Sequence, residues 1–139
     1  MRIIYLHQYF KRPTESGGTR SYDLAYSFVK GGHEVDMVTT TDSSVGFDGK
    51  KWKLEMVDGI RVHYLHLPYD NSFSFIKRAW VFFLFLWYSS MKLLAIKADL
   101  VLATSTPLTI GIPALIKKTF HRTPYIFEVR DVWPEAVVA

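Results

Sequence analysis

The sequence predicts an α/β fold with an open, mostly parallel β-sheet, helices on both faces and a β-hairpin inserted at one edge. Short apolar runs, typical of buried parallel strands, alternate with longer segments of helical character. Two segments instead alternate strictly between apolar and polar residues on either side of an Asp-Gly pair, which is typical of a hairpin. The expected strands cover residues 2–6, 35–39, 52–56, 60–65, 99–103 and 124–129.

The chain begins with one strand–helix–strand unit. A polar loop, 7–18, follows the first strand, and apolar residues then recur at helical spacing from Leu24 to Val29. Gly31 and Gly32 end this helix before the second apolar run. This order is typical of a right-handed βαβ crossover, and the pattern as a whole is Rossmann-like.

Two further helices are expected in the second half of the chain. Residues 72–97 are helical and very apolar, and Pro107 opens the helix that precedes the last strand. Pro134 could start another helix, and the sequence ends a few residues later at Ala139. We therefore expect residues 1–139 to form a single domain whose fold is incomplete.

Composition excludes several classes of protein. Hydrophobic residues make up 49% and charged residues 22% of the chain, as in globular domains. The chain has no cysteine, which excludes disulfides and thiolate metal sites and suits the cytoplasm. Its net charge of +4 is modest and dispersed, so no nucleic-acid partner is expected. The five histidines show no metal spacing, and no catalytic residue can be named from this order.

Ligands of an open parallel sheet bind beyond the carboxyl ends of its strands, which directs attention to the loops there. Gly17 and Gly18 let the backbone approach a ligand just before a helix, whose amino end favours an anion. Arg20, expected two residues inside that helix, would add a positive charge, although a flexible turn and a solvated arginine explain the same residues. The fingerprint G-x-G-x-x-G is absent, which counts against NAD or FAD.

Two later loops carry further polar residues. Thr104, Ser105 and Thr106 place hydroxyls at a strand end, and either bind a ligand or cap the helix that Pro107 opens. Glu128 lies on the same side of its strand as Arg130 and could pair with it. The segment that follows brings charged groups to the same edge of the sheet, with helix capping by Asp131 or Trp133 as the alternative. Its candidate ligand-binding residues are Arg130, Asp131 and Glu135.

The long apolar helix combines basic and aromatic residues. Its uninterrupted apolar run is too short to span a bilayer. A helix lying in the membrane surface fits better, with Lys77, Arg78, Trp80, Phe83 and Trp87 as the docking residues. A helix enclosed between the sheet and a partner would also be apolar all round, and this alternative stays open.

Three segments together carry a family resemblance. Gly17-Gly18-Thr19-Arg20 before a helix, and Gly32-His33-Glu34-Val35 before a strand, resemble the amino-terminal domain of retaining GT-B glycosyltransferases. The closing segment, Phe127 to Glu135, is similar to the branch that builds bacterial surface polysaccharides of the colanic acid and O-antigen type. The resemblance covers residues 1–139.

The resemblance implies two Rossmann-like domains, of which this chain is the amino-terminal, acceptor-side half and the donor-binding half is missing. It implies transfer of a sugar from a nucleotide-sugar donor to a saccharide, without a cofactor or a metal. The loop of Gly17 and Gly18 would face the donor diphosphate. Thr104 to Thr106, with Arg130 and Asp131, would line the acceptor side. Many relatives carry a histidine where this chain has Thr104-Ser105-Thr106, so no catalytic residue is carried over.

An acceptor on a polyprenyl diphosphate would sit in the membrane, so the resemblance implies a cytoplasmic protein peripheral to the inner membrane. The fragment alone would be inactive, and the complete protein would be the enzyme. Two rivals remain at this stage. One is a membrane- or protein-binding module without catalysis, for which the aromatic helix would be the working surface. The other is a nucleotide-binding enzyme such as an epimerase, which the absent glycine fingerprint disfavours.

Overall fold

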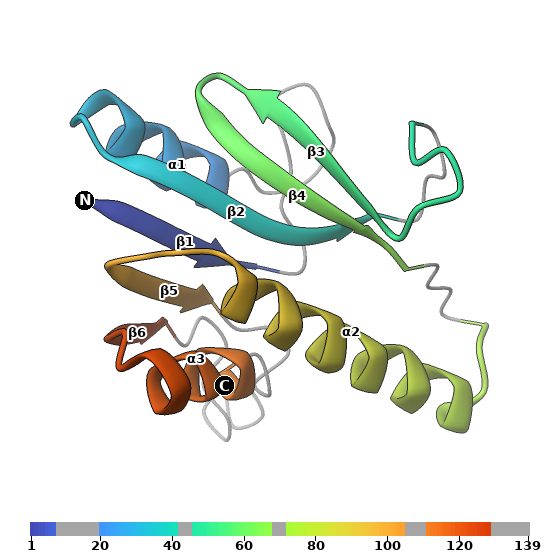
Figure 1. Ribbon diagram of the computed structural model, residues 1–139. Helices are drawn as coiled ribbons and strands as arrows, with labels where there is room; N and C mark the ends of the chain where they lie inside the picture. Colours follow the sequence, from blue (N-terminus) through green and yellow to red (C-terminus); the bar gives the residue numbers. More distant parts are fainter. Residues whose placement is uncertain (8–19, 42–45, 68–71, 105–110, 129–139) are drawn as a thin grey trace, which may run out of the picture.

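The computed structural model describes residues 1–7, 20–41, 46–67, 72–104 and 111–128. In this part of the chain, six strands form one sheet that carries helices on both faces (Figure 1). The elements, in chain order, are β1 (Arg2–Leu6), α1 (Arg20–Lys30), β2 (Glu34–Thr41), β3 (Trp52–Val57), β4 (Ile60–His66), α2 (Phe75–Ala95), β5 (Leu100–Thr104), α3 (Gly111–His121) and β6 (Tyr125–Glu128). The α/β, Rossmann-like fold predicted from the sequence is confirmed.

The strand order is β3-β4-β2-β1-β5-β6. All neighbouring strands are parallel except β3, which is antiparallel to β4 at one edge of the sheet. The hairpin is therefore inserted as expected, and its second strand joins the sheet in parallel beside β2. We call the edge at which the five parallel strands end the carboxyl edge, and the opposite edge the amino edge.

Helix boundaries follow local signals. α1 ends where Gly32 adopts a φ of +90° and the amide of His33 donates to the carbonyl of Phe28, a glycine-terminated helix end. α2 begins after Ser74, whose hydroxyl accepts a hydrogen bond from the amide of Lys77. The helix expected over 72–97 is thus slightly shorter, and the expected start of the next helix at Pro107 lies outside the described residues.

The turn of the hairpin has left-handed backbone at both central residues. Asp58 has a φ of +50° and Gly59 a φ of +86°, as a two-residue hairpin turn of type I′ requires. The turn is held against α1, because the hydroxyl of Tyr22 donates to the Asp58 carboxylate. This hydrogen bond, together with burial, raises the pKa of Tyr22 to about 12.

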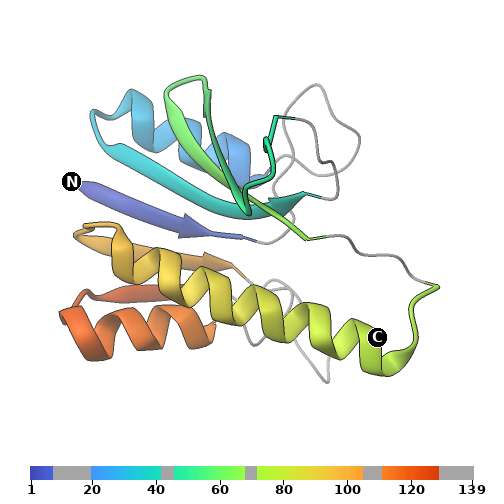
Figure 2. The same ribbon diagram turned by 45° about the vertical axis from the view of Figure 1, so that its right-hand side comes forward.

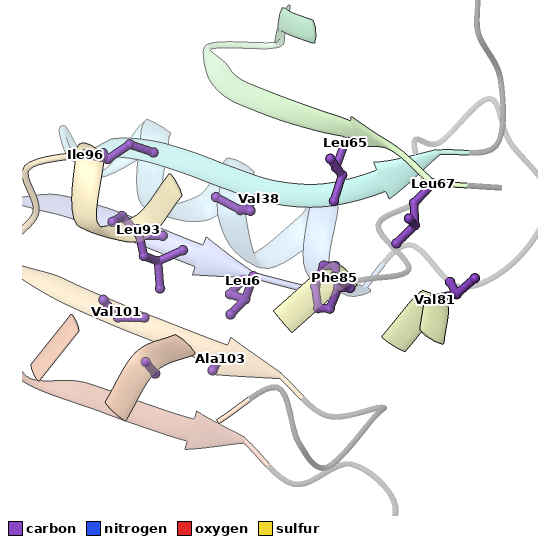
Figure 3. Packing of buried hydrophobic residues seen from close by; sticks show 12 residues of the cluster. Leu6, Val38, Leu65, Leu67, Val81, Phe85, Leu93, Ile96, Val101 and Ala103 are labelled. Atoms are coloured by element: carbon purple, nitrogen blue, oxygen red, sulfur yellow. The ribbon is translucent and has the colours of Figure 1, made fainter. Parts of the chain in front are cut away.

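Each face of the sheet has its own hydrophobic core. α1 packs over one face, where Tyr5, Met37 and Val62 are buried with Ala25 of the helix. α2 and α3 cover the other face, where Phe85 and Leu93 of α2 pack against the strands (Figures 1 and 3). Successive side chains of one strand point to opposite faces of the sheet and are buried in different cores. The sequences of these strands are therefore continuous apolar runs.

A buried carboxylate ties three strands together on the α2 side of the sheet. Asp36 of β2 is 1% exposed and accepts hydrogen bonds from Arg61 Nε at 2.9 Å and from Arg2 Nε at 3.3 Å. The ring nitrogen Nε2 of His63 lies 2.9 Å from the same carboxylate. Burial by itself would raise the pKa of Asp36, but the hydrogen bonds from His63 and Arg61 outweigh it and hold the pKa well below its usual range.

Candidate functional site

The sheet changes its direction of winding between β1 and β5. From β1 the chain crosses over α1 to β2 on one side, whereas from β5 it crosses over α3 to β6 on the other side. β1 and β5 are hydrogen-bonded neighbours, so their carboxyl ends mark the topological switch point. Ligands of doubly wound sheets bind in the crevice at this point, because the two connecting loops diverge there.

Two hydroxyls meet beneath the switch point. Thr104, the last residue of β5, is fully buried, and its Oγ1 donates to the phenol oxygen of Tyr5 at 3.4 Å. The sequence proposed Thr104 as a ligand-binding residue. In the structure its hydroxyl is bound to Tyr5 of the neighbouring strand, and its side chain is fully buried at the carboxyl end of β5.

A second buried pair fastens the start of α1 to the end of β1. His7 Nδ1 lies 2.9 Å from Ser21 Oγ, and both residues are buried. The amide of His7 also donates to the carbonyl of Val38 on β2. Sequence reasoning did not single out His7 or Ser21. The available signal was the position of His7 directly after a buried strand, where a polar residue reaches the carboxyl edge.

An ion pair lies across the carboxyl edge. Arg20 Nη2 is 2.9 Å from Glu128 Oε1, with the side chains 59% and 21% exposed. Arg20 is the first residue of α1, whereas the sequence placed it two residues inside the helix. Glu128 ends β6, so the pair extends from one side of the switch point to the other. The sequence suggested Arg130 as the partner of Glu128; Arg130 lies outside the described residues.

The geometry of this pair leaves hydrogen-bonding capacity unused. Glu128 Oε1 is buried and, within the part of the chain that the structure describes, has no aligned hydrogen bond despite the nearby guanidinium. An exposed ion pair of this kind adds little to stability. Arg20 therefore presents a largely exposed positive charge at the carboxyl edge, beside a carboxylate that can still accept a hydrogen bond.

The other residues proposed for this edge are not described by the structure. They are Gly17, Gly18, Ser105, Thr106, Arg130, Asp131 and Glu135. All of them belong to the segments that continue from β1, β5 and β6. Within the described ranges no group of three or more histidine or acidic side chains could hold a metal ion.

The long helix α2 presents an apolar face that the domain does not cover. Trp80, Phe83 and Trp87 are 57%, 52% and 57% exposed, and they follow the spacing of one helical face. Phe85 and Ser89 on the opposite face are fully buried against the sheet. Figures 1 and 2 show the amino-terminal part of α2 running beyond the carboxyl ends of β1 and β5.

Comparison with known families assigns the chain. A family described as "Glycosyl transferase 4-like domain" matches residues 17–138, which is most of the sequence. The chain belongs to this glycosyl transferase 4-like family. Membership implies a sugar donor and an acceptor, and it agrees with an amino-terminal GT-B domain as the resemblance suggested.

A solved structure confirms the fold of this glycosyl transferase 4-like domain. The C-terminal domain of a hydrogenase from Pyrococcus furiosus superposes with a TM-score of 0.63, covering 91% of this chain and 90% of that one. Sequence identity is 15%, so the likeness concerns the fold alone. A search of curated proteins gives no sequence match.

No helix among the described residues of the glycosyl transferase 4-like domain is both long and apolar enough to cross a membrane. α2 has 21 residues and includes Lys77, Arg78 and Lys92.

Proposed function

We propose that this glycosyl transferase 4-like domain is the acceptor-side half of a retaining, two-domain glycosyltransferase. The complete protein would move a sugar from a nucleotide-sugar donor to a lipid-linked saccharide during synthesis of a bacterial surface polysaccharide. The observation that carries the proposal is the placement of Arg20 and Glu128 over the switch point in a chain of this family. We expect a cytoplasmic protein that is peripheral to the inner membrane and needs neither cofactor nor metal.

The chemistry of sugar transfer accounts for the features of this edge. Negative charge develops on the departing diphosphate as the bond to the sugar breaks, and fixed donors at that position lower the barrier. Arg20 can turn from Glu128 toward such an anion, since a guanidinium pairs well with phosphate oxygens. Glu128 Oε1 can then accept a hydrogen bond from a sugar hydroxyl. The loop of Gly17 and Gly18 would supply backbone amides beside them.

Replacing Arg20 with glutamine tests this assignment in the complete protein. We expect kcat/KM for sugar transfer to fall by about tenfold to a hundredfold, because a hydrogen bond to a charged group contributes about 1.5–3 kcal/mol. The measurement is release of nucleoside diphosphate from nucleotide sugars in the presence of a membrane extract. Lys30→Gln is the matched control, because Lys30 is an exposed cation at the other end of the same helix.

Two outcomes would count against the assignment in different ways. If Arg20→Gln and Lys30→Gln retain equal kcat/KM, Arg20 is a surface residue and the site lies elsewhere. If the unaltered complete protein releases no nucleoside diphosphate from any nucleotide sugar, the glycosyltransferase proposal itself fails. A non-catalytic membrane- or protein-binding module then becomes the better account of the exposed α2 face.

We further propose that α2 docks the domain on a membrane surface. Its exposed aromatic residues are flanked by Lys77, which is exposed, and by Arg78, which is partly exposed. A helix with an aromatic face and basic flanks lies in the headgroup region of anionic bilayers. Such a position would bring the carboxyl edge close to an acceptor held in the bilayer, because α2 projects past that edge (Figure 2).

Vesicle flotation tests the docking proposal. With vesicles of phosphatidylcholine and phosphatidylglycerol, the double variant Trp80→Ser/Trp87→Ser should bind at least about tenfold more weakly, since each ring loses apolar area that the bilayer would bury. The matched control is Leu54→Ser/Met56→Ser, which removes two similarly exposed apolar residues from β3. Equal binding by both double variants and the unaltered chain would rule out docking through α2.

A further inference from the structure

A small pocket lies at the carboxyl edge beside the end of β4. It has a volume of about 370 Å³, and its lining residues are Phe47, Gly49, Lys50, Lys51 and His66. Phe47 is buried, and its ring centroid lies 5.3 Å from that of His66. None of these residues belongs to the switch-point crevice, and sequence reasoning did not identify them.

The backbone that carries the pocket is fixed by hydrogen bonds. The amide of Lys50 donates to the carbonyl of Phe47 at 2.9 Å, which closes a turn. The amide of His66 donates to the carbonyl of Lys51 at 3.0 Å, which joins this turn to β4. Gly49 has a φ of +77°, a conformation that a residue with a Cβ rarely adopts. Backbone hydrogen bonds therefore hold the turn of Phe47 to Lys50 together and join Lys51 to the end of β4.

The lining is cationic. Its lining residues include two lysines and one histidine, and no acidic residue. Asp48 belongs to the same turn but is not a lining residue. Lysine ammonium groups with an imidazole favour a compact anion with several acceptor oxygens, which is the chemistry of a phosphate.

The pocket is continuous with the flank of α2. Lys51 Nζ lies 5.1 Å from the centroid of the Tyr88 ring, and Tyr88 directly follows Trp87 on the helix. On the same flank, Lys92 Nζ lies 4.5 Å from the centroid of the Trp52 ring. A basic pocket thus adjoins a helix whose outer face is apolar and exposed. One molecule that matches both surfaces is a lipid with an anionic phosphate headgroup.

We propose that the pocket of Phe47, Lys50, Lys51 and His66 binds the phosphate of an anionic lipid headgroup while the apolar face of α2 lies in the adjoining bilayer. This inference rests on the proposed docking through α2 and deepens it. A headgroup held at one defined point would fix the rotation of the domain about α2. The switch-point crevice would then face the membrane in one orientation, which a helix alone does not determine.

The test compares charge removal at the pocket with the same removal elsewhere. Lys50→Gln/Lys51→Gln should bind vesicles of phosphatidylcholine and phosphatidic acid about tenfold or more weakly, since each lysine near an anionic surface contributes about 1 kcal/mol. The control is Lys30→Gln/Lys118→Gln. These two exposed lysines lie at the amino edge, and each stacks on a tyrosine ring as Lys51 does. The control should bind nearly as well as the unaltered chain, and equal weakening by the two pairs would overturn the pocket as a specific site.

A second measurement separates a lipid headgroup from a free phosphate. Dihexanoyl phosphatidic acid should shift the ring resonances of His66 in NMR spectra at lower concentration than glycerol 3-phosphate does, because only the lipid also contacts α2. Trp80→Ser/Trp87→Ser should abolish that difference. If the unaltered chain binds both ligands with equal affinity, the pocket binds a soluble phosphate compound and the lipid assignment is wrong. If vesicle binding depends on Trp80 and Trp87 but not on Lys50 and Lys51, the pocket is not a headgroup site. Docking through α2 would still stand.

Discussion

Replacing Asp36 with asparagine is expected to lower the free energy of unfolding by about 3 kcal/mol at neutral pH. Breaking a buried ion pair by removing one partner costs about 3–5 kcal/mol, because the other charge is left without its counterion. The lower end applies here, since Arg2 and Arg61 are 36% and 29% exposed and regain some water. Urea unfolding of the two proteins at pH 7 measures the difference.

Acid should remove the difference between these two proteins. The pKa of Asp36 in the folded state lies well below its usual range, because the hydrogen bonds from His63 and Arg61 outweigh the effect of burial. A lowered pKa gives stability that is fully present above the unfolded value, about 4, and is lost as the pH falls through the folded value. The unaltered chain should therefore lose stability below about pH 4 more steeply than Asp36→Asn. Parallel curves would contradict this assignment.

Glu55→Gln provides the control for Asp36→Asn. Glu55 lies 3.6 Å from Lys53, and both side chains keep contact with solvent. A surface pair of this kind contributes about 0–1 kcal/mol, so the variant should unfold close to the unaltered chain. A loss as large as that of Asp36→Asn would mean that the burial of Asp36 is not the cause of its effect.

Replacing Phe85 with alanine is expected to destabilise the domain by about 3–5 kcal/mol. Phe85 is fully buried between α2 and the sheet, so the substitution removes apolar contacts and leaves a cavity (Figure 3). Phe83→Ala, two positions earlier on the same helix, should cost less than about 1 kcal/mol because its side chain is half exposed. Thermal and urea unfolding of both variants give the comparison.

The contrast between these two phenylalanines decides which face of α2 is structural. If Phe83→Ala destabilised the chain as much as Phe85→Ala, the outer face of α2 would be packed in solution. Docking on a membrane through Trp80 and Trp87 would then lose its basis. If only Phe85→Ala destabilises, the outer face is available to a bilayer, and the vesicle experiments can be interpreted without a change in folding.

Local patterns in the sequence determined the elements and their order. The hairpin is the clearest case, since Asp58 and Gly59 are the residues that a two-residue turn with positive φ demands. Periodicity located the helices to within a few residues, because the spacing of apolar side chains is set by the geometry of each element. The segments around Gly17-Gly18 and Gly32-His33 resemble the amino-terminal domain of GT-B glycosyltransferases, and the match to the glycosyl transferase 4-like family supports that part of the resemblance.

The tertiary structure decided which residues meet. Nothing local indicated that β4 pairs in parallel with β2, or that Arg20 pairs with Glu128 across the switch point. Asp36 looks like a polar interruption of a buried strand until its partners on β1 and β4 are known. These contacts join residues far apart in the chain, so they depend on strand order and register, which periodicity does not contain.

The helix α2 shows most clearly which features the sequence determines and which depend on the tertiary structure. Its sequence is apolar all round, so composition alone could not tell an enclosed helix from one at a membrane surface. Packing against the sheet covers Phe85 and leaves Trp80 and Trp87 exposed. The sequence thus determined that this helix is apolar on more than one face. Only the fold determined which face the domain itself covers, because that depends on where the helix crosses the sheet.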